Sequence, residues 1–214
     1  MPRLQASRLA AISDSDRLDD RPTAARILEA AAGLFARKGY GQTSVQDVAD
    51  AVGILKGSLY YYIDSKEDLL FRLLDDIHQE TSQIVKEVEP LEDVPAIDRL
   101  GMYVQRHVEF NARNTTKITV YYQDIGLLSP KRRKVILEQR KLYEDFVEGL
   151  IEEAQAAGDI DRSLNAKLLT FFVFANINWL YTWYKPRGAI KPDEVAALCS
   201  DFVLAGVTGS KATA

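Results

Sequence analysis

Three observations predict an all-α fold of nine helices. Apolar residues recur at helical spacing from residue 21 onward, no stretch alternates apolar and polar residues as a strand would, and Gly, Pro or Asn interrupt the apolar stretches. Of the 214 residues, 47% are apolar and 27% are charged, which is typical of a globular protein and excludes a disordered or collagen-like chain.

The chain is expected to begin with a flexible arm, because residues 1–20 mix charges of both signs and present no sustained apolar face. A helix over residues 22–38 follows. Pro22 lies in its first turn, and Gly39 ends it.

Two short helices come next. Thr43 with Gln46 has the spacing of a capping box and predicts a helix over residues 44–51. Gly53 closes that helix, and a second short helix is expected over residues 56–62.

Longer helices fill the rest of the chain. Ser65 with Asp68 forms a second capping-box pattern, which opens a long helix that reaches about residue 89. The remaining helices are predicted over residues 96–113, 116–127, 131–157, 166–184 and 193–207. Their ends are marked by Asn114, by Ser129 with Pro130, by Gly158 with Asp159, and by Pro186 with Gly188.

The two short helices match a helix-turn-helix arrangement, in which the second helix can enter the major groove of DNA. That second helix contains three consecutive tyrosines, which cannot all face one core. Tyrosine, lysine and serine side chains suit phosphate oxygens and base edges, and a glycine lets the backbone approach DNA closely. The candidate DNA contacts are Thr43, Ser44, Lys56, Gly57, Ser58, Tyr60, Tyr61, Tyr62 and Lys66.

Structural roles stay open as alternatives for three of these residues. Tyr60 could pack against the first helix, Thr43 could act as a cap alone, and Lys66 could be a solvated lysine. Lys66 opposes the dipole at the start of its helix, and a nearby phosphate would explain its placement.

The formal net charge of −4 does not indicate a nucleic-acid binder, so any basic surface must be local. Residues 21–66 contain six basic and four acidic residues, a net charge of +2. The remainder of the chain is therefore acidic.

The sequence TSVQDVADAVGILKGSLYYYIDSKEDLL, preceded by ARILEAAAGLFARKGY, resembles the DNA-binding domain of the TetR family of bacterial transcriptional regulators. The resemblance covers about residues 21–75. It implies that the family's DNA-contacting positions are those of Ser44, Lys56, Gly57, Ser58, Tyr60, Tyr61, Tyr62 and Lys66. Two residues depart from the pattern: Leu55 stands where Ser or Thr usually caps the recognition helix, and Ile63 stands where Phe is usual. The first departure removes one expected phosphate contact.

This resemblance implies a division of the chain into two domains after the arm. Residues 21–81 are the expected DNA-binding domain, with the helix-turn-helix at about 44–63, and residues 82–214 are the expected ligand-binding and dimerisation domain. The helix over 166–184 is apolar on nearly all sides, which predicts that a partner surface buries it. The resemblance implies a homodimer through the last two helices, which would bind a palindromic double-stranded DNA operator.

Polar and amphipathic residues interrupt the apolar faces of the later helices, as in a pocket for a sizeable, mostly apolar effector. These candidate ligand residues are His107, Asn111, Tyr121, Tyr122, Arg140, Tyr143, Asn176, Trp179 and Trp183. Taken singly, each could instead be a satisfied core or interface residue. VYYQDIG and NWLYTWYKPRGAIKPDEV resemble a TetR branch that senses acyl-CoA thioesters in lipid or sterol catabolism, so the effector is an acyl-CoA or, alternatively, an aromatic or lipid-like compound without CoA.

Other functional classes fit the sequence less well. A helical enzyme acting on acyl thioesters would have to use Cys199 with His107, and Cys199 lies among apolar residues where a packing role is expected. One Cys and two His are too few for a His/Cys metal cluster, so we expect no metal and no cofactor beyond the effector. The sequence predicts neither a secretion signal nor a membrane span, so we expect a cytoplasmic protein.

Overall fold

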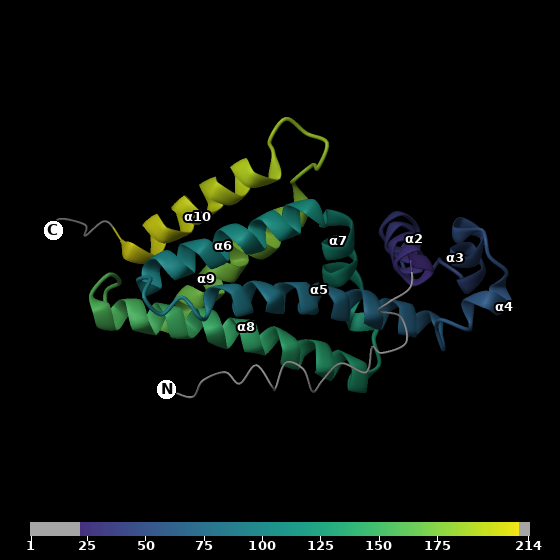
Figure 1. Cartoon of the computed structure of the whole chain (residues 1–214), viewed down its shortest axis with the longest axis horizontal. Coiled ribbons are helices and arrows are strands. Elements are labelled where there is room, and N and C mark those ends of the chain that lie inside the picture. The colour runs from purple at the N-terminus through teal and green to yellow at the C-terminus, as the bar shows by residue number, and fades with distance from the viewer. Residues whose placement is uncertain (1–21, 210–214) are drawn as a thin grey trace. The chain divides into compact units, whose positions relative to one another are not determined.

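The computed structural model describes residues 22–209. The predicted arm lies outside the described residues. Between residues 22 and 209 the chain forms nine α-helices and two short 3-10 helices with no strand, which confirms the predicted all-α class. Figure 1 shows these helices in their order along the chain.

The described residues divide into two compact units. The N-terminal unit contains residues 22–79 and 116–139, and the C-terminal unit contains residues 80–115 and 140–209. Helices α5 and α8 each continue from one unit into the other, because α5 spans Lys66–Val88 and α8 spans Pro130–Ala157.

The N-terminal unit begins with α2, Pro22–Lys38, followed by α3, Val45–Val52, and α4, Lys56–Leu59. It also holds most of α7, Thr115–Asp124, and the 3-10 helix η1, Ile125–Leu127. Its core is formed by fully buried apolar side chains from α2, α3, α4, the start of α5 and the turn before it, among them Ile27, Phe35, Val48, Leu59, Ile63, Leu69 and Leu70.

The C-terminal unit contains α6, Ala96–Arg113, α9, Ala166–Asn178, and α10, Pro192–Thr208, with the 3-10 helix η2, Trp179–Thr182, following α9. Figure 1 shows α10 running alongside α6. The two helices approach closely at Gly101, where a Cβ atom would lie 2.9 Å from Leu204 Cδ1.

Most helix bounds match those predicted, and the differences have local causes. The helices over 22–38 and 96–113 have the predicted bounds. The predicted helices over 116–127 and 166–184 instead end in η1 and η2, and regular α-helix in the predicted 56–62 helix stops at Leu59. In that segment the Tyr61 and Tyr62 amides donate to Ser58 and Leu59 three residues back, so the chain tightens into turns.

Candidate nucleic-acid interface

The start of α3 is fixed by a capping box, one residue later than predicted. Ser44 Oγ accepts a hydrogen bond from the Asp47 amide at 3.1 Å, and Asp47 Oδ2 accepts one from the Ser44 amide at 2.7 Å. Thr43, predicted to pair with Gln46, is 1% exposed, and its hydroxyl donates to the Gly39 carbonyl at 2.9 Å. The Thr43 side chain therefore faces the interior rather than the surface where DNA would lie.

Asp47 carries a stable negative charge beside the start of α3. Hydrogen bonds from the Ser44 side chain and backbone, and then from Lys38, lower the pKa of Asp47 well below its usual range. A carboxylate near a helix N-terminus is also favoured by the helix dipole.

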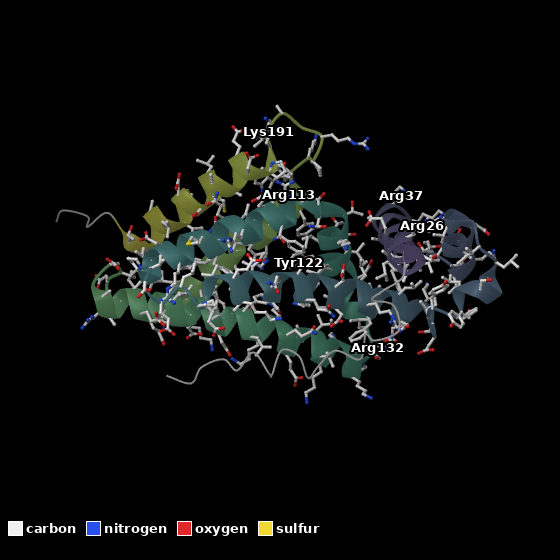
Figure 2. The ribbon with its side chains drawn as sticks, in the orientation of Figure 1. Arg26, Arg37, Arg113, Tyr122, Arg132 and Lys191 are labelled. Carbon is white, nitrogen blue, oxygen red and sulfur yellow. The ribbon has the colours of Figure 1, made fainter. Side chains whose placement is uncertain are left out.

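The turn between α3 and α4 depends on Gly53, whose φ of 74° lies in the left-handed region that favours glycine. The Gly53 amide donates to the Asp50 carbonyl at 3.2 Å, and the Ile54 amide donates to the Ala49 carbonyl at 3.0 Å. Arg26, labelled in Figure 2, comes from α2 and donates to the Val52 carbonyl at 3.1 Å. The geometry of a helix-turn-helix is thus set by α2 as well as by the turn itself.

Helix α4 presents most of its side chains to solvent. Leu59 is its buried anchor. In the turns that follow α4, Ile63 is buried, whereas Tyr60 is 48% exposed and Tyr61 is 71% exposed; we call residues 56–63 the α4 segment. Tyr62 is half-buried, and its ring meets the Tyr61 ring edge-to-face at 5.5 Å between centroids.

The smaller predicted contacts on α4 are also on the surface. Lys56, Gly57 and Ser58 are exposed, and a Cβ atom added to Gly57 would have no neighbour within 4 Å. The structure therefore brings Lys56, Gly57, Ser58, Tyr60 and Tyr61 together on one exposed segment. That segment has the donors and rings that contact phosphates and base edges.

Lys66 has a structural partner that the sequence did not indicate. Its ammonium donates to the Tyr40 carbonyl at 2.9 Å and to the Gly41 carbonyl at 3.4 Å, and it lies 4.3 Å from the centroid of the Tyr40 ring. These contacts give Lys66 a structural role at the start of α5, and its contact with a DNA phosphate stays a prediction.

Three of the predicted ligand residues meet in the core of the C-terminal unit. His107 is buried, its Nδ1 lies 3.0 Å from the Tyr103 hydroxyl, and its ring meets that of Tyr143 edge-to-face at 5.8 Å. Burial lowers the pKa of His107 to about 3, so the imidazole is neutral at physiological pH. Asn111 Nδ2 donates to the Ile177 carbonyl at 3.2 Å.

The other predicted ligand residues have different surroundings, and their binding of an effector stays a prediction. Tyr121 and Tyr122 belong to the N-terminal unit, where the Tyr121 ring meets His78 edge-to-face at 5.3 Å. Arg140 Nε donates to Glu144 at 2.6 Å on its own helix.

Three more of them lie on the exposed side of α9 and η2. Asn176 donates to the Phe172 carbonyl at 2.7 Å within α9, and Trp179 and Trp183 are 64% and 52% exposed. Sequence reasoning also missed Tyr103 and Phe174, whose rings meet that of His107, and Phe146, whose ring meets that of Tyr103. These residues are spaced as on any buried helix face, so the sequence did not distinguish them from ordinary core residues.

A buried polar network in the N-terminal unit was also missed. Asp68 accepts from Arg72 Nε at 2.8 Å and from Arg132 Nη2 at 2.9 Å. Two turns further along α5, Asp75 accepts from Gln139 at 2.6 Å, and burial raises the pKa of its carboxyl. These bonds join α5 to the start of α8, and only the i,i+4 spacing of Asp68 and Arg72 could have been read from the sequence.

Within residues 22–209, no helix combines the length and the apolar character that crossing a membrane requires. The same residues hold no group of three or more His, Cys, Asp or Glu side chains placed to bind a metal ion.

Comparison with known proteins identifies relatives for both halves of the chain. Residues 93–207 match the model of the tetracyclin repressor-like C-terminal domain, and residues 27–73 match the model of bacterial regulatory proteins of the tetR family. The HTH-type transcriptional repressor KstR2 of Rhodococcus jostii strain RHA1 is 30% identical over 190 residues, which cover 85% of this chain and 89% of the relative.

Solved structures agree with these matches. The TetR family transcriptional regulator PfmR from Thermus thermophilus superposes with a TM-score of 0.77 at 30% identity, covering 84% of this chain and 97% of PfmR. AibR in complex with isovaleryl coenzyme A and operator DNA superposes with a TM-score of 0.73 at 26% identity, covering 85% of this chain and 96% of AibR.

Proposed function

The chain belongs to the TetR family of bacterial regulatory proteins, and from this premise we propose that it is a DNA-binding transcriptional repressor that a small effector releases from its operator. The family places it among transcriptional regulators rather than enzymes. The observation that carries the proposal is the exposed α4 segment, where Lys56, Ser58 and Tyr61 face solvent around the buried anchor Leu59.

The proposed DNA contacts come from the N-terminal unit. Exposed side chains of residues 56–62 would enter the major groove, and the exposed Ser44 at the start of α3 would contact a phosphate. The proposed contacts are Ser44, Lys56, Gly57, Ser58, Tyr60, Tyr61, Tyr62 and Lys66. Thr43 is left out because its hydroxyl is buried against the Gly39 carbonyl.

Within the family's two-part layout, we propose residues 21–81 as the DNA-binding domain and residues 82–214 as the effector-binding and dimerisation domain. By sequence, residues 116–139 belong to the second of these domains. In the structure they pack in the same compact unit as the helix-turn-helix.

A homodimer through α9 and α10 is supported by the apolar side chains that these helices expose. On α9 and η2 they recur at helical spacing as one stripe, and α10 adds two more. The stripe consists of Leu168, Phe171, Phe172, Trp179 and Trp183, with Leu198 and Phe202 on α10. Large exposed apolar patches mark interaction surfaces, and a two-fold dimer would place two α4 helices on the halves of a palindromic operator.

The proposed effector is mostly apolar. The buried cluster of His107, Asn111 and Tyr143 offers a few polar atoms among apolar and aromatic walls, which is the chemistry of a small-molecule site. AibR is described with isovaleryl coenzyme A and operator DNA, which supports an acyl-CoA as the effector of this chain. An aromatic or lipid-like compound without CoA is the alternative.

For an effector to release DNA, its affinity must differ between the DNA-bound and free conformations. We propose that the conformational change passes along α5, since this helix begins beside the recognition segment and ends in the C-terminal unit. As a DNA-bound regulator the protein would act in the cytoplasm.

Gel-shift analysis on the DNA upstream of its own gene tests the proposal. We expect a shifted complex that a series of acyl-CoAs dissociates, while the matching free fatty acids and CoA alone do not. Absence of a shift on any upstream fragment would contradict the repressor assignment. A shift that free acids or aromatic compounds relieve, and acyl-CoAs do not, would favour the alternative effector.

A further inference from the structure

The charge of the N-terminal unit depends on a segment outside the helix-turn-helix. Residues 22–79 contain six basic and eight acidic residues, a net charge of −2. Residues 116–139, which belong to the same unit, contain five basic and two acidic residues, a net charge of +3. The described part of the unit that would approach DNA is therefore positive only because it includes the start of α8.

This positive charge is concentrated in the first turn of α8. Lys131, Arg132, Arg133 and Lys134 are consecutive, and the turn contains no acidic residue. We call the three exposed members, Lys131, Arg133 and Lys134, the basic turn.

The basic turn is little neutralised by the protein itself. Lys134 has a surface partner in Glu138 at 3.7 Å, a pair whose two side chains are 76% and 52% exposed. Across residues 22–209, Lys131 and Arg133 have no ion pair. At least two of the three charges are available to a partner.

Half-buried contacts fix the basic turn to the start of α5. The Ser129 amide donates to Glu67 Oε1 at 2.9 Å, and Arg132 Nη2 donates to Asp68 Oδ1 at 2.9 Å. The Arg132 guanidinium also lies 5.1 Å from the centroid of the Phe71 ring. Arg132 is labelled at this point in Figure 2.

Through these contacts the basic turn lies against the first turn of α5, which closely follows the α4 segment in the chain. The first turn of α5 starts at Lys66, only a few residues after α4 ends at Leu59. The half-buried contacts hold the basic turn against the start of α5, within the same compact unit as the helix-turn-helix.

Fold stability does not explain the basic turn. Cations in the first turn of a helix oppose its dipole, and neighbouring like charges repel each other. The three exposed cations therefore reduce the stability of this helix start, and binding of a polyanion would offset that loss.

We propose that the basic turn is a second DNA contact, which binds phosphates beside the segment that α4 reads. This inference rests on the proposed function and extends it to residues outside the helix-turn-helix. The contact is electrostatic and reads no sequence, so it would raise affinity for any duplex and increase the dependence of that affinity on salt.

The test compares three proteins on a random-sequence duplex of about 40 base pairs. They are the wild type, a basic-turn variant (Lys131→Gln, Arg133→Gln, Lys134→Gln), and a control that removes three exposed cations of the C-terminal unit (Lys86→Gln, Lys167→Gln, Arg187→Gln). Fluorescence anisotropy at several salt concentrations gives the slope of log K against log salt. Thermal unfolding of each protein checks the fold.

We expect the slope for the basic-turn variant to be shallower by about 2 to 3 per bound protomer, since each lost phosphate contact removes about 0.9. Its affinity at low salt falls, its midpoint of thermal unfolding is unchanged or higher, and the control keeps the wild-type slope. A basic-turn variant with the wild-type slope would overturn the inference, as would an equal loss in the control, which would indicate a general effect of net charge.

Two other results separate this inference from its premise. If the wild type binds no duplex at any salt concentration, the proposed function itself fails. If the basic-turn variant keeps duplex binding but loses binding to phosphatidylglycerol vesicles, the basic turn serves a membrane surface and the inference is overturned.

Discussion

His107 and Tyr103 form a buried pair on successive turns of α6, with the His107 Nδ1 3.0 Å from the Tyr103 hydroxyl. The Tyr103 ring is fully buried and meets Phe146 and Phe174 edge-to-face at 5.7 and 6.4 Å. The pair belongs to the buried cluster of the proposed effector site, and burial keeps the histidine in its neutral form.

The neutral histidine makes stability depend on pH in a defined direction. Burial lowers the pKa of His107 to about 3 in the folded protein, whereas an unfolded histidine has a pKa of about 6.5. Below pH 6.5 the unfolded state takes up a proton that the folded state cannot, so stability falls by about 1.4 kcal/mol per pH unit until the folded pKa is reached.

Substitution His107→Gln should remove that contribution. Urea unfolding gives the free energy of unfolding of each protein at pH 7 and at pH 5. From pH 7 to pH 5 this free energy should fall by about 2 kcal/mol more in the wild type than in His107→Gln. The carboxylates that titrate in both proteins cancel in this comparison. Equal losses in the two proteins would mean that His107 titrates normally in the folded state.

A missing cap at the start of α4 offers a gain in stability. Leu55 occupies the N-cap position with extended backbone, makes no side-chain cap bond and is 79% exposed. Leu55→Ser should raise the free energy of unfolding by about 1 kcal/mol, because a hydroxyl can accept from a free amide of the first turn. Leu55→Ala is the matched control and should leave stability unchanged in urea denaturation; an equal gain there would show that loss of the exposed leucine is the cause.

The proposed dimer depends on the exposed face of α9. Phe172 is 63% exposed on the chain, and Phe172→Arg would place a charge in the centre of the apolar stripe. We expect sedimentation velocity to show a monomer for Phe172→Arg and a dimer for the wild type. Leu137→Arg, which charges an apolar side chain that is 45% exposed on α8, should remain a dimer. A dimeric Phe172→Arg protein would exclude this face as the interface.

Helix ends were predicted correctly where a glycine or a proline marks them. Gly39 with φ 82° ends α2, and proline starts α2 and directly precedes α6, so these bounds were predicted correctly. The capping box failed by one residue because Thr43 and Ser44 are adjacent hydroxyls. Only the structure shows that Asp47 pairs with Ser44 while the Thr43 hydroxyl turns inward.

Which residues of α9 are buried could not be predicted, for a physical reason. Helix α9 is apolar on nearly all sides, so its sequence does not tell which face joins the core of its own chain. Phe174 and Ile177 proved to be buried, whereas Trp179 lies on the exposed face. Contacts between distant parts of the chain, such as Asp75 with Gln139, leave no local sequence signal.

The proposed function depends most on the exposed face of the α4 segment. The operator affinity of variants at this surface tests that function most directly. We expect Lys56→Ala to weaken binding to the upstream fragment and to reduce the salt slope by about 1, and Tyr61→Phe to weaken binding without changing the slope, because its hydroxyl carries no charge. Lys141→Ala, which removes an exposed lysine of the C-terminal unit, is the control, and thermal unfolding should be unchanged in all three. Wild-type affinity in both Lys56→Ala and Tyr61→Phe would contradict the assignment of α4 as the recognition helix.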